Sequence, residues 1–290
     1  MNYLIYLVFR LFVFLFRIVP FRVLYLFADF LYLIIFYVVG YRKKVVVANL
    51  LASFPGKSGE ERMKIAKAFY HHLSDMLIES LKGFSMREQE MITRYRFHDT
   101  SQVNAMYRQG RSVIIVAGHY GNWEWAGIAA GNQMLHRPVG FYKPLSNPYI
   151  DRYMRNSRIQ GRSTLAPITQ TKETFRADYG EPAAFYMVAD QSPSSPRLAY
   201  WVNFLEQDTA TLHGPEKYAA MLNLPVFFAY VSRIKRGKYV VYFEPIALEP
   251  TQTTNGEITR SFMRRLEKII IDRPDLYLWS HRRWKLHRNK

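Results

Sequence analysis

Ser112-Val-Ile-Ile-Val-Ala-Gly-His-Tyr-Gly-Asn-Trp-Glu124 is the stretch of sequence that decides the fold. Its first six residues form an apolar run typical of a short buried strand. A loop with a histidine between two glycines follows, and a helix is expected from about Trp123. A strand, a loop and a helix in this order indicate an α/β unit, and open α/β sheets place their sites at the carboxyl ends of such strands.

The same alternation continues along the chain. Three further strands are predicted at 183–189, 225–231 and 238–243, and the last two are joined by a hairpin turn at Lys235-Arg-Gly237. Helical patterns lie at 45–83 (broken near 54–56 and resumed with a capping box at Ser58 and Glu61), 148–159, 169–177, 215–222 and 258–272. We therefore expect an α/β fold with a mixed central sheet flanked by helices.

The N-terminus has a different character. Residues 3–16 and 23–39 are apolar except for Arg10 and Asp29, and a basic run, Tyr41-Arg-Lys-Lys44, follows. Each apolar run is shorter than the roughly 20 residues that span a bilayer comfortably. No small-residue cleavage site follows the first run, which disfavours a signal peptide. We expect residues 1–44 to be a membrane anchor of hydrophobic helices and 45–290 a catalytic domain; whether the anchor spans the bilayer or lies in one leaflet stays open.

Charge and composition limit the classes of function. Lys plus Arg number 40 against 23 Asp plus Glu, a formal net charge of +17, and the 290 residues include no cysteine. The charge calls for an anionic partner, such as lipid headgroups, an acidic carrier protein or nucleic acid. A nucleic-acid-binding protein would leave the apolar N-terminus unexplained, and no basic helix or RNA-binding signature is present. Without cysteine there is no thiolate nucleophile or thiolate metal site.

His119 and Glu124 are the candidate catalytic pair. Acyl transfer to a hydroxyl needs a base, which a histidine oriented by a carboxylate supplies. In one continuous helix the two side chains would point about 140° apart, so they can meet only if His119 stays in the loop. A metal hydrolase using His119, Glu124, His136 and Asp190 is the competing interpretation, but no two histidines have the close spacing of metal ligands.

Four further segments, together with this pair, resemble the bacterial lipid A biosynthesis (late) acyltransferases of the lysophospholipid acyltransferase superfamily. The first three are Asn147-Pro-Tyr-Ile-Asp151 with Arg155, Arg158 and Gly161; Asp190-Gln-Ser-Pro193; and Trp201-Val-Asn-Phe204 with Thr209, Thr211 and Gly214. The fourth and most specific is Tyr277-Leu-Trp-Ser-His-Arg-Arg-Trp-Lys285. The similarity covers nearly the whole chain and implies a glycerolipid acyltransferase-like fold.

The resemblance also implies the reaction. The donor would be an acyl chain on acyl carrier protein, the acceptor a hydroxyl of a lipid A precursor, a phosphorylated glucosamine disaccharide, and no cofactor would be required. The enzyme would work with membrane lipids at the cytoplasmic face of the bacterial inner membrane. The chain departs from the best-known members at Gly121, Trp123 and Gln191. Because the superfamily also acylates other lipids, a lysophospholipid or another lipid remains the alternative acceptor.

Residue roles follow from the resemblance. His119 would be the general base and Glu124 would orient it. Arg158, with Arg155 second, would contact the acyl carbonyl, its oxyanion or an acceptor phosphate. Asp190 would organise the site through His119 or Arg158. The remaining substrate-binding residues would be Asn122 in the loop and Arg282, Arg283 and Lys285, whose segment 279–285 reads as too polar for the core.

Overall fold

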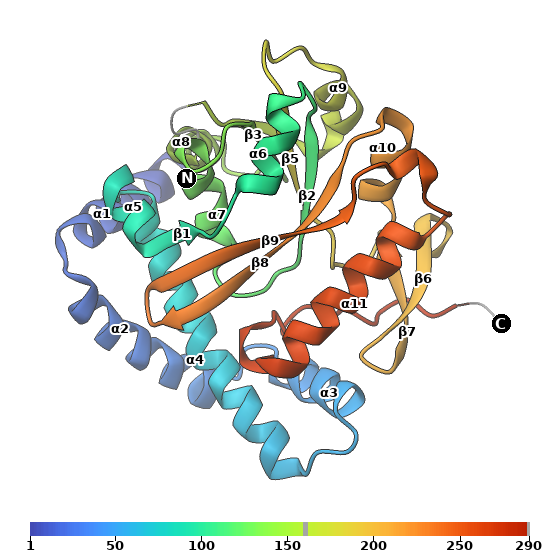
Figure 1. The fold of residues 1–290 in the computed structure, drawn as a ribbon. Helices are drawn as coiled ribbons and strands as arrows, with labels where there is room; N and C mark the ends of the chain where they lie inside the picture. The colour runs from blue at the N-terminus through green and yellow to red at the C-terminus, as the bar shows by residue number, and fades with distance from the viewer. Residues whose placement is uncertain (159–161, 289–290) are drawn as a thin grey trace.

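A seven-stranded sheet forms the centre of the computed structural model, which describes residues 1–158 and 162–288 (Figure 1). The strand order is β1-β9-β8-β2-β5-β3-β4, and every neighbouring pair is parallel except the β8–β9 hairpin. The strands are β1 (Tyr95–Phe97), β2 (Val113–Ala117), β3 (Arg137–Tyr142), β4 (Thr164–Pro167), β5 (Ala183–Val188), β8 (Val226–Lys235) and β9 (Lys238–Ala247). The predicted α/β fold, its mixed sheet and its hairpin are confirmed.

Five strands were not predicted. Strands β1, β3 and β4 lie toward the two edges of the sheet, and β6 (Ala199–Phe204) pairs with β7 (Gln207–Leu212) in a separate antiparallel hairpin. Most lack the continuous apolar run of a central strand: β3 begins Arg137-Pro-Val-Gly, and proline and glycine both weaken a strand assignment. The exception is β6, which begins Ala199-Tyr-Trp-Val202. These strands form because a neighbouring strand pairs with them, which local sequence does not reveal.

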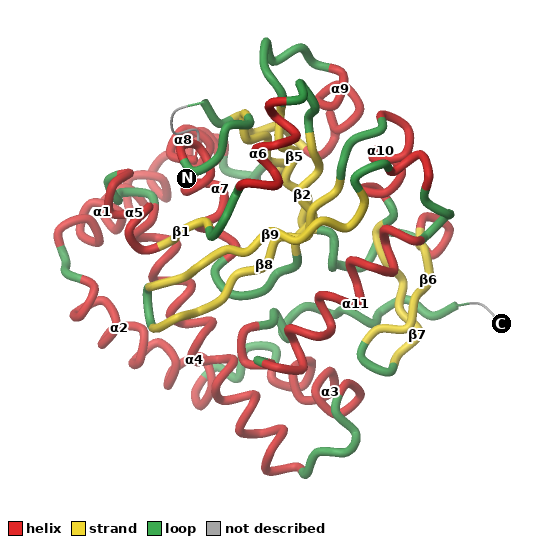
Figure 2. The backbone as a smooth tube through the Cα atoms, in the orientation of Figure 1, coloured by secondary structure: helices red, strands yellow, loops and turns green. Residues whose placement is uncertain are grey.

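Helices cover both faces of the sheet (Figure 2). Alternate residues of β2 separate the two cores: Ile114 and Val116 pack with α11, while Val113 and Ile115 pack with α6 and α7. The helices of the domain are α3 (Lys43–Ser53), α4 (Gly59–Gly83), α5 (Glu88–Arg94), α6 (Ser101–Arg108), α7 (Trp123–Ala129), α8 (Pro148–Arg158), α9 (Thr171–Arg176), α10 (Gly214–Leu222) and α11 (Glu257–Asp272). Short 3₁₀ turns lie at Ala130–Asn132, Ile168–Gln170, Pro196–Leu198, Pro250–Gln252 and Pro274–Leu276.

The N-terminal segment forms α1 (Asn2–Ile18), α2 (Phe21–Leu33) and a π-helical turn, Ile34–Val38. Residues Phe21–Val38 are long and apolar enough to cross a membrane, judged by length and composition alone. In the structure α2 lies along α4 (Figure 1). Leu24 and Ala28 of α2 are buried, whereas Leu26 and Phe30 are exposed. The segment is therefore packed on the domain through one face while it presents an apolar face outward.

Polar contacts fix these helices to α4, which begins with the predicted capping box at Ser58. Buried Lys82 donates to the carbonyls of Phe16, Arg17 and Val19 at the C-terminal end of α1, where a cation is favourable. Tyr25 of α2 donates to the buried Glu79 at 2.9 Å. The N-terminal helices and the rest of the chain are thus joined by specific hydrogen bonds as well as by apolar packing.

Candidate active site

The loop Gly118–Asn122 connects β2 to α7 and runs close to β8. Gly121 has φ +65°, and a Cβ there would lie 3.1 Å from the carbonyl oxygen of Val231 and 2.9 Å from its Cβ. Only glycine combines this left-handed conformation with such a close approach to another backbone. The glycine after His119 therefore allows the chain to turn sharply at the end of the strand.

The C-terminal segment holds the same loop from one side. The amide of Gly121 donates to the carbonyl of Leu276 at 2.9 Å, and the amide of Leu278 donates to the carbonyl of His119 at 3.1 Å. The hydroxyl of Tyr120 donates to the carbonyl of Ile269 at 3.0 Å. The backbone on both sides of the histidine is thereby fixed before any substrate arrives.

Helix α4 supports the loop from the other side. The side-chain nitrogen Nδ2 of Asn122 donates to Glu79 at 2.7 Å. The side-chain oxygen of Asn122 caps α7 by accepting from the backbone amide of Trp125. Nε2 of His72 lies 3.3 Å from the carbonyl of Gly121 and donates to it. Burial raises the pKa of Glu79 to about 7 and lowers the pKa of His72 to about 3, so His72 is neutral at physiological pH.

Asp190 is the hydrogen-bond partner of the candidate base. Nδ1 of His119 lies 2.6 Å from Oδ1 of Asp190. The two residues come together because β2 and β5 are adjacent parallel strands, with Ala117 opposite Val188, and each residue lies just beyond the end of its strand. A carboxylate on Nδ1 fixes the tautomer and leaves Nε2 as the basic atom.

The electrostatics of this pair suit a general base. Burial of the ring lowers the pKa of His119, but the charge and hydrogen bond of Asp190 outweigh burial, and the charge of Glu124 adds to them, so the pKa is raised. For Asp190, burial raises the pKa, but the contact with His119 and the nearby charge of Arg283 bring it below its usual value. Asp190 therefore stays ionised and favours the imidazolium that forms when His119 takes up a proton.

Nε2 of His119 points to the substrate side of the site. The amide nitrogen of Gln191 lies 3.2 Å from it and donates to the unprotonated ring nitrogen. The indole ring of Trp123 stands edge-on to the imidazole, with ring centroids 5.1 Å apart. A substrate hydroxyl that takes the place of the Gln191 amide would find an oriented base.

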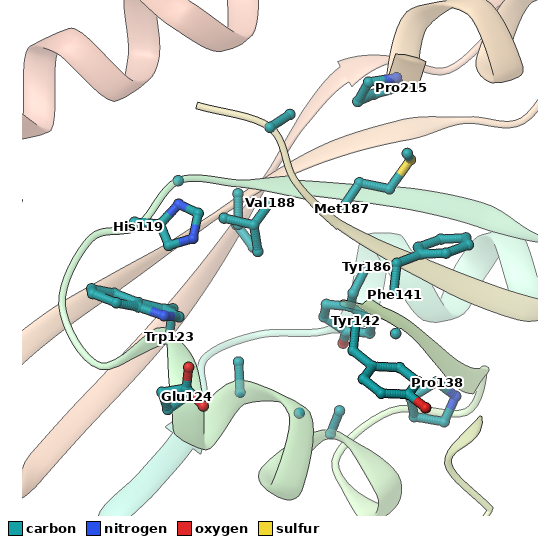
Figure 3. A pocket seen from close by; sticks show the side chains of 18 of the residues that line it. His119, Trp123, Glu124, Pro138, Phe141, Tyr142, Tyr186, Met187, Val188 and Pro215 are labelled. Carbon is teal, nitrogen blue, oxygen red and sulfur yellow. The ribbon is translucent and has the colours of Figure 1, made fainter. Parts of the chain in front are cut away.

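A cavity of about 830 Å³ opens beside His119. Figure 3 shows His119, Trp123 and Glu124 at one side of it and Phe141, Tyr142, Tyr186 and Pro138 at the other. Most of the remaining wall is apolar, and it includes Met187, Val188, Leu212, Phe228, Leu266 and Ile269. A polar end with a base and a long apolar wall fit a substrate that carries a reactive group on a hydrocarbon chain.

The chain matches known acyltransferases over most of its length. The family model described as bacterial lipid A biosynthesis acyltransferase matches residues 1–286. The chain belongs to this family. A lipid A biosynthesis lauroyltransferase of Escherichia coli K12 is 24% identical over 249 residues, which are 84% of this chain and 79% of the relative. A palmitoleoyltransferase of the same pathway and strain is 22% identical over 252 residues, with the same two coverages. This member of the lipid A biosynthesis acyltransferase family is therefore an O-acyltransferase.

The expected hydrogen bond between His119 and Glu124 is replaced by the bond to Asp190. Nδ1 of His119 is engaged by Asp190 and Nε2 by Gln191. Glu124 lines the same cavity, in the first turn of α7, and acts on His119 through its charge. A role for Glu124 in catalysis by this acyltransferase stays a prediction.

Two of the expected substrate-binding residues are buried parts of the scaffold. Asn122 is fully buried and serves as the cap and the Glu79 contact described above. Arg283 is 1% exposed, with its guanidinium donating to the carbonyl of Ala210 at 2.6 Å and lying over the ring of Phe204. The prediction that Arg283 binds phosphate or headgroups at the surface is wrong, because its side chain stands behind Asp190, inside the protein.

The segment 279–285 is more buried than its polar composition indicated. Trp279 is fully buried and donates to the carbonyl of Pro274, and Ser280 is 5% exposed. Arg282 and Lys285, in contrast, are exposed, and binding of anionic groups by them stays a prediction. The segment alternates between the interior and the surface where it runs beside the loop Gly118–Asn122.

No contact among the described residues places Arg155 or Arg158 at the cavity. Arg155 is an exposed residue of α8. Arg158 is the last residue of the same helix, but its side chain and Gly161 lie outside the described residues. His136, from the metal-hydrolase alternative, contacts the carbonyl of Arg111 at 3.0 Å, away from His119. Roles for Arg155 and Arg158 stay predictions.

The residues that the sequence alone did not reveal are those that position the loop. Glu79 and His72 belong to α4, far from the motif in sequence. The His119–Asp190 pair did carry a signal, because each residue follows a buried strand. Only the knowledge that these two strands are neighbours turns that signal into a contact.

Proposed function

We propose that this acyltransferase moves a fatty acyl chain from acyl carrier protein to a hydroxyl of a lipid A precursor. The observation that carries the chemistry is the 2.6 Å contact between His119 and Asp190 at the polar end of a largely apolar cavity. The family match and the two relatives support the acceptor, because both relatives are named for transfer in lipid A biosynthesis.

The reaction needs one proton relay. Nε2 of His119 takes the proton of the acceptor hydroxyl as its oxygen attacks the thioester carbonyl. The tetrahedral oxyanion collapses, the carbon–sulfur bond breaks, and the imidazolium returns the proton to the leaving thiolate. The products are the new ester and the free thiol of the carrier, so charge and protons balance within the site.

Two carboxylates divide the support of His119. Asp190 orients the ring and stabilises its charged form through the hydrogen bond on Nδ1. Glu124 faces the cavity and favours the imidazolium at longer range by its charge. The proposed catalytic pair of His119 and Glu124 thus includes Asp190 as a third member, and Arg158 remains the proposed donor to the acyl carbonyl or an acceptor phosphate.

The setting of the reaction is proposed to be the cytoplasmic face of the bacterial inner membrane. The apolar outer faces of α1 and α2 would sit in one leaflet, since Asp29, halfway along the apolar stretch Phe21–Val38, is paired with Arg236 of the β8–β9 hairpin. A sheet hairpin cannot enter the hydrocarbon region, so a helix tied to it at mid-length is poorly placed to span. The +17 charge would attract both anionic lipid and the acidic carrier protein.

The proposal is tested with purified protein, acyl carrier protein loaded with a fatty acid, and a lipid A precursor in detergent micelles. We expect His119→Ala to abolish transfer and Asp190→Asn to reduce kcat about 10²–10⁴-fold, the range for loss of general base catalysis. His98→Ala is the control, because His98 is exposed and packs on Tyr242 outside the cavity.

Full activity of either site variant would contradict the mechanism. Transfer by the wild-type protein to a lysophospholipid, with none to the lipid A precursor, would replace the acceptor and keep the chemistry. Mass spectrometry of lipid extracts from cells with and without the gene would identify the acylated product.

A further inference from the structure

A second cavity, of about 450 Å³, lies between the anchor and the C-terminal segment. Its wall is formed by the end of the π-helical turn, one face of α4 and the chain just before the C-terminus. The residues on which the argument depends are Val39, Arg42, Leu77, Gln191, Leu278 and His281. Neither the family match nor the relatives assign a function to this cavity.

The inner end of this second cavity reaches the catalytic histidine. Gln191 lines both cavities, and its amide is the group 3.2 Å from Nε2 of His119. The ring of His281 stands at the same end, and its Nε2 atom is buried without a hydrogen-bond partner among the described residues. Polar groups are therefore concentrated at the end next to the base, where a ligand hydroxyl or carbonyl could pair with them.

The outer end opens on the apolar surface of the anchor. Val39 is 65% exposed and Leu77 is 42% exposed, and the neighbouring Val38 is 79% exposed. The opening is thus continuous with the helix faces that are proposed to contact the bilayer. A hydrocarbon chain could pass from that surface into the cavity without crossing water.

Positive charge borders the same opening. Arg42 is exposed and is held at the rim by donating to the carbonyl of Ser280 at 3.0 Å. Lys43 and Lys44 follow in the chain, and the ammonium of Lys43 lies 4.0 Å from the ring centroid of Phe36. An anionic headgroup left at the rim would meet these cations.

We propose that the second cavity is the acceptor groove: it takes an acyl chain of an anionic lipid from the bilayer and delivers that lipid's hydroxyl to His119. The hydroxyl displaces the amide of Gln191 from Nε2, and the donor chain occupies the larger cavity. The role of this lipid as the acceptor rests on the proposed function, whereas the binding of an anionic lipid's chain in the cavity does not.

A variant that blocks the groove shows which of the two substrates binds there. Leu77→Trp places a large ring at the opening, and Leu248→Trp is the matched control, since Leu248 is 45% exposed and lines neither cavity. With acyl-loaded carrier protein and a lipid A precursor in micelles, Leu77→Trp is expected to raise the KM for the lipid at least about tenfold, the equivalent of about 1.4 kcal/mol. The KM for the loaded carrier protein should stay within about twofold.

A rise in the KM for the carrier-bound donor alone would assign the groove to the donor chain and overturn the proposal. Unchanged KM values for both substrates would also overturn it. The control should behave as the wild type in both measurements.

A labelling experiment does not depend on turnover. The full-length protein is bound to vesicles of phosphatidylethanolamine and phosphatidylglycerol, with a trace of phosphatidylglycerol that carries a photoreactive diazirine in one acyl chain. We expect labelled peptides containing Leu77 and Leu278, lost in Leu77→Trp and kept in Leu248→Trp. Labels confined to the outer faces of α1 and α2 would exclude the groove, whereas groove labelling without any transfer to lipid A precursor would retain it and defeat the proposed function.

Discussion

At the scale of single residues, three side chains act on the imidazole ring of His119. Nδ1 of His119 is hydrogen-bonded to Asp190, Nε2 accepts from Gln191, and Glu124, on the same side of the cavity, acts on the ring through its charge. The carboxylate on Nδ1 belongs to Asp190, which follows a neighbouring strand, whereas the sequence motif had suggested Glu124, at the start of the next helix. The expectation that Asp190 acts through His119 is confirmed as a contact, whereas the catalytic roles of His119 and Glu124 stay predictions.

The pH profile should reveal both carboxylates. A general base must be unprotonated, so kcat/KM falls as the pH drops below the pKa of His119. Asp190 and Glu124 both raise this pKa, so Glu124→Gln and Asp190→Asn should each move the acidic limb to lower pH. We expect Glu124→Gln to lower the plateau about tenfold, less than Asp190→Asn does. An acidic limb at unchanged pH in Glu124→Gln would contradict an effect of the Glu124 charge on the pKa of His119.

At the scale of elements, an ionic cluster around the buried Asp75 connects the N-terminal helices to the sheet. Arg236, in the turn of the β8–β9 hairpin, donates to Asp75 of α4 at 2.8 Å and to Asp29 of α2 at 2.6 Å. Arg233 donates to Asp75 as well, and its Nη1 lies 3.3 Å from His72, which supports Gly121 of the catalytic loop. Asp29 and Asp75 with His71 form a compact acidic group, and these two arginines already neutralise it. One chain of contacts thus runs from the anchor to the active-site loop.

Removing the hairpin arginine should destabilise the fold. Arg236→Met leaves the fully buried Asp75 with one cation fewer, and we expect a loss of about 2–4 kcal/mol in the free energy of unfolding. Arg265→Met is the matched control: the two arginines are 28% and 33% exposed, but Glu244, the partner of Arg265, is 46% exposed. The control should cost no more than about 1 kcal/mol. Chemical denaturation in detergent measures the free energy of unfolding of both variants. Equal losses would contradict the expectation that burial of Asp75 makes its ion pair more important for stability.

At the scale of the whole molecule, apolar side chains that face outward gather on the N-terminal helices. Leu11, Phe14, Leu26 and Phe30 are each at least half exposed, on α1 and α2 at one edge of the molecule (Figure 1). Monomeric soluble proteins rarely expose a contiguous apolar surface of this kind. Because the opposite faces of both helices pack on the domain, the exposed face is the part of this protein that we expect to meet the bilayer.

Charge on that face should release the protein from vesicles. Leu26→Lys with Phe30→Lys replaces side chains that are 68% and 60% exposed, so the fold should tolerate the change. Binding to phosphatidylethanolamine–phosphatidylglycerol vesicles at high salt, where surface charge is screened, should fall at least about tenfold in a sedimentation assay. Met221→Lys, which is 52% exposed on the distant α10, is the control (Figure 1). Unchanged sedimentation of the double variant would contradict the membrane-facing surface.

The sequence by itself determined the central strands, the β8–β9 hairpin, the helices of the anchor and the position of His119. All of these follow from local physics: apolar periodicity, turn-forming residues and capping. The family was also readable from the sequence, because His119, Glu124 and the segment 277–285 resemble its motifs, and the family match over residues 1–286 confirms that resemblance.

Only the tertiary structure decided which groups meet. It placed β2 beside β5 and so brought Asp190 to Nδ1 of His119, and it buried Arg283 in the core. It also joined Glu79, His72 and Arg236 into the support of the catalytic loop. Such contacts link residues tens to hundreds of positions apart, and the free energy that selects them comes from packing the whole sheet and its helices, which no local stretch of sequence contains.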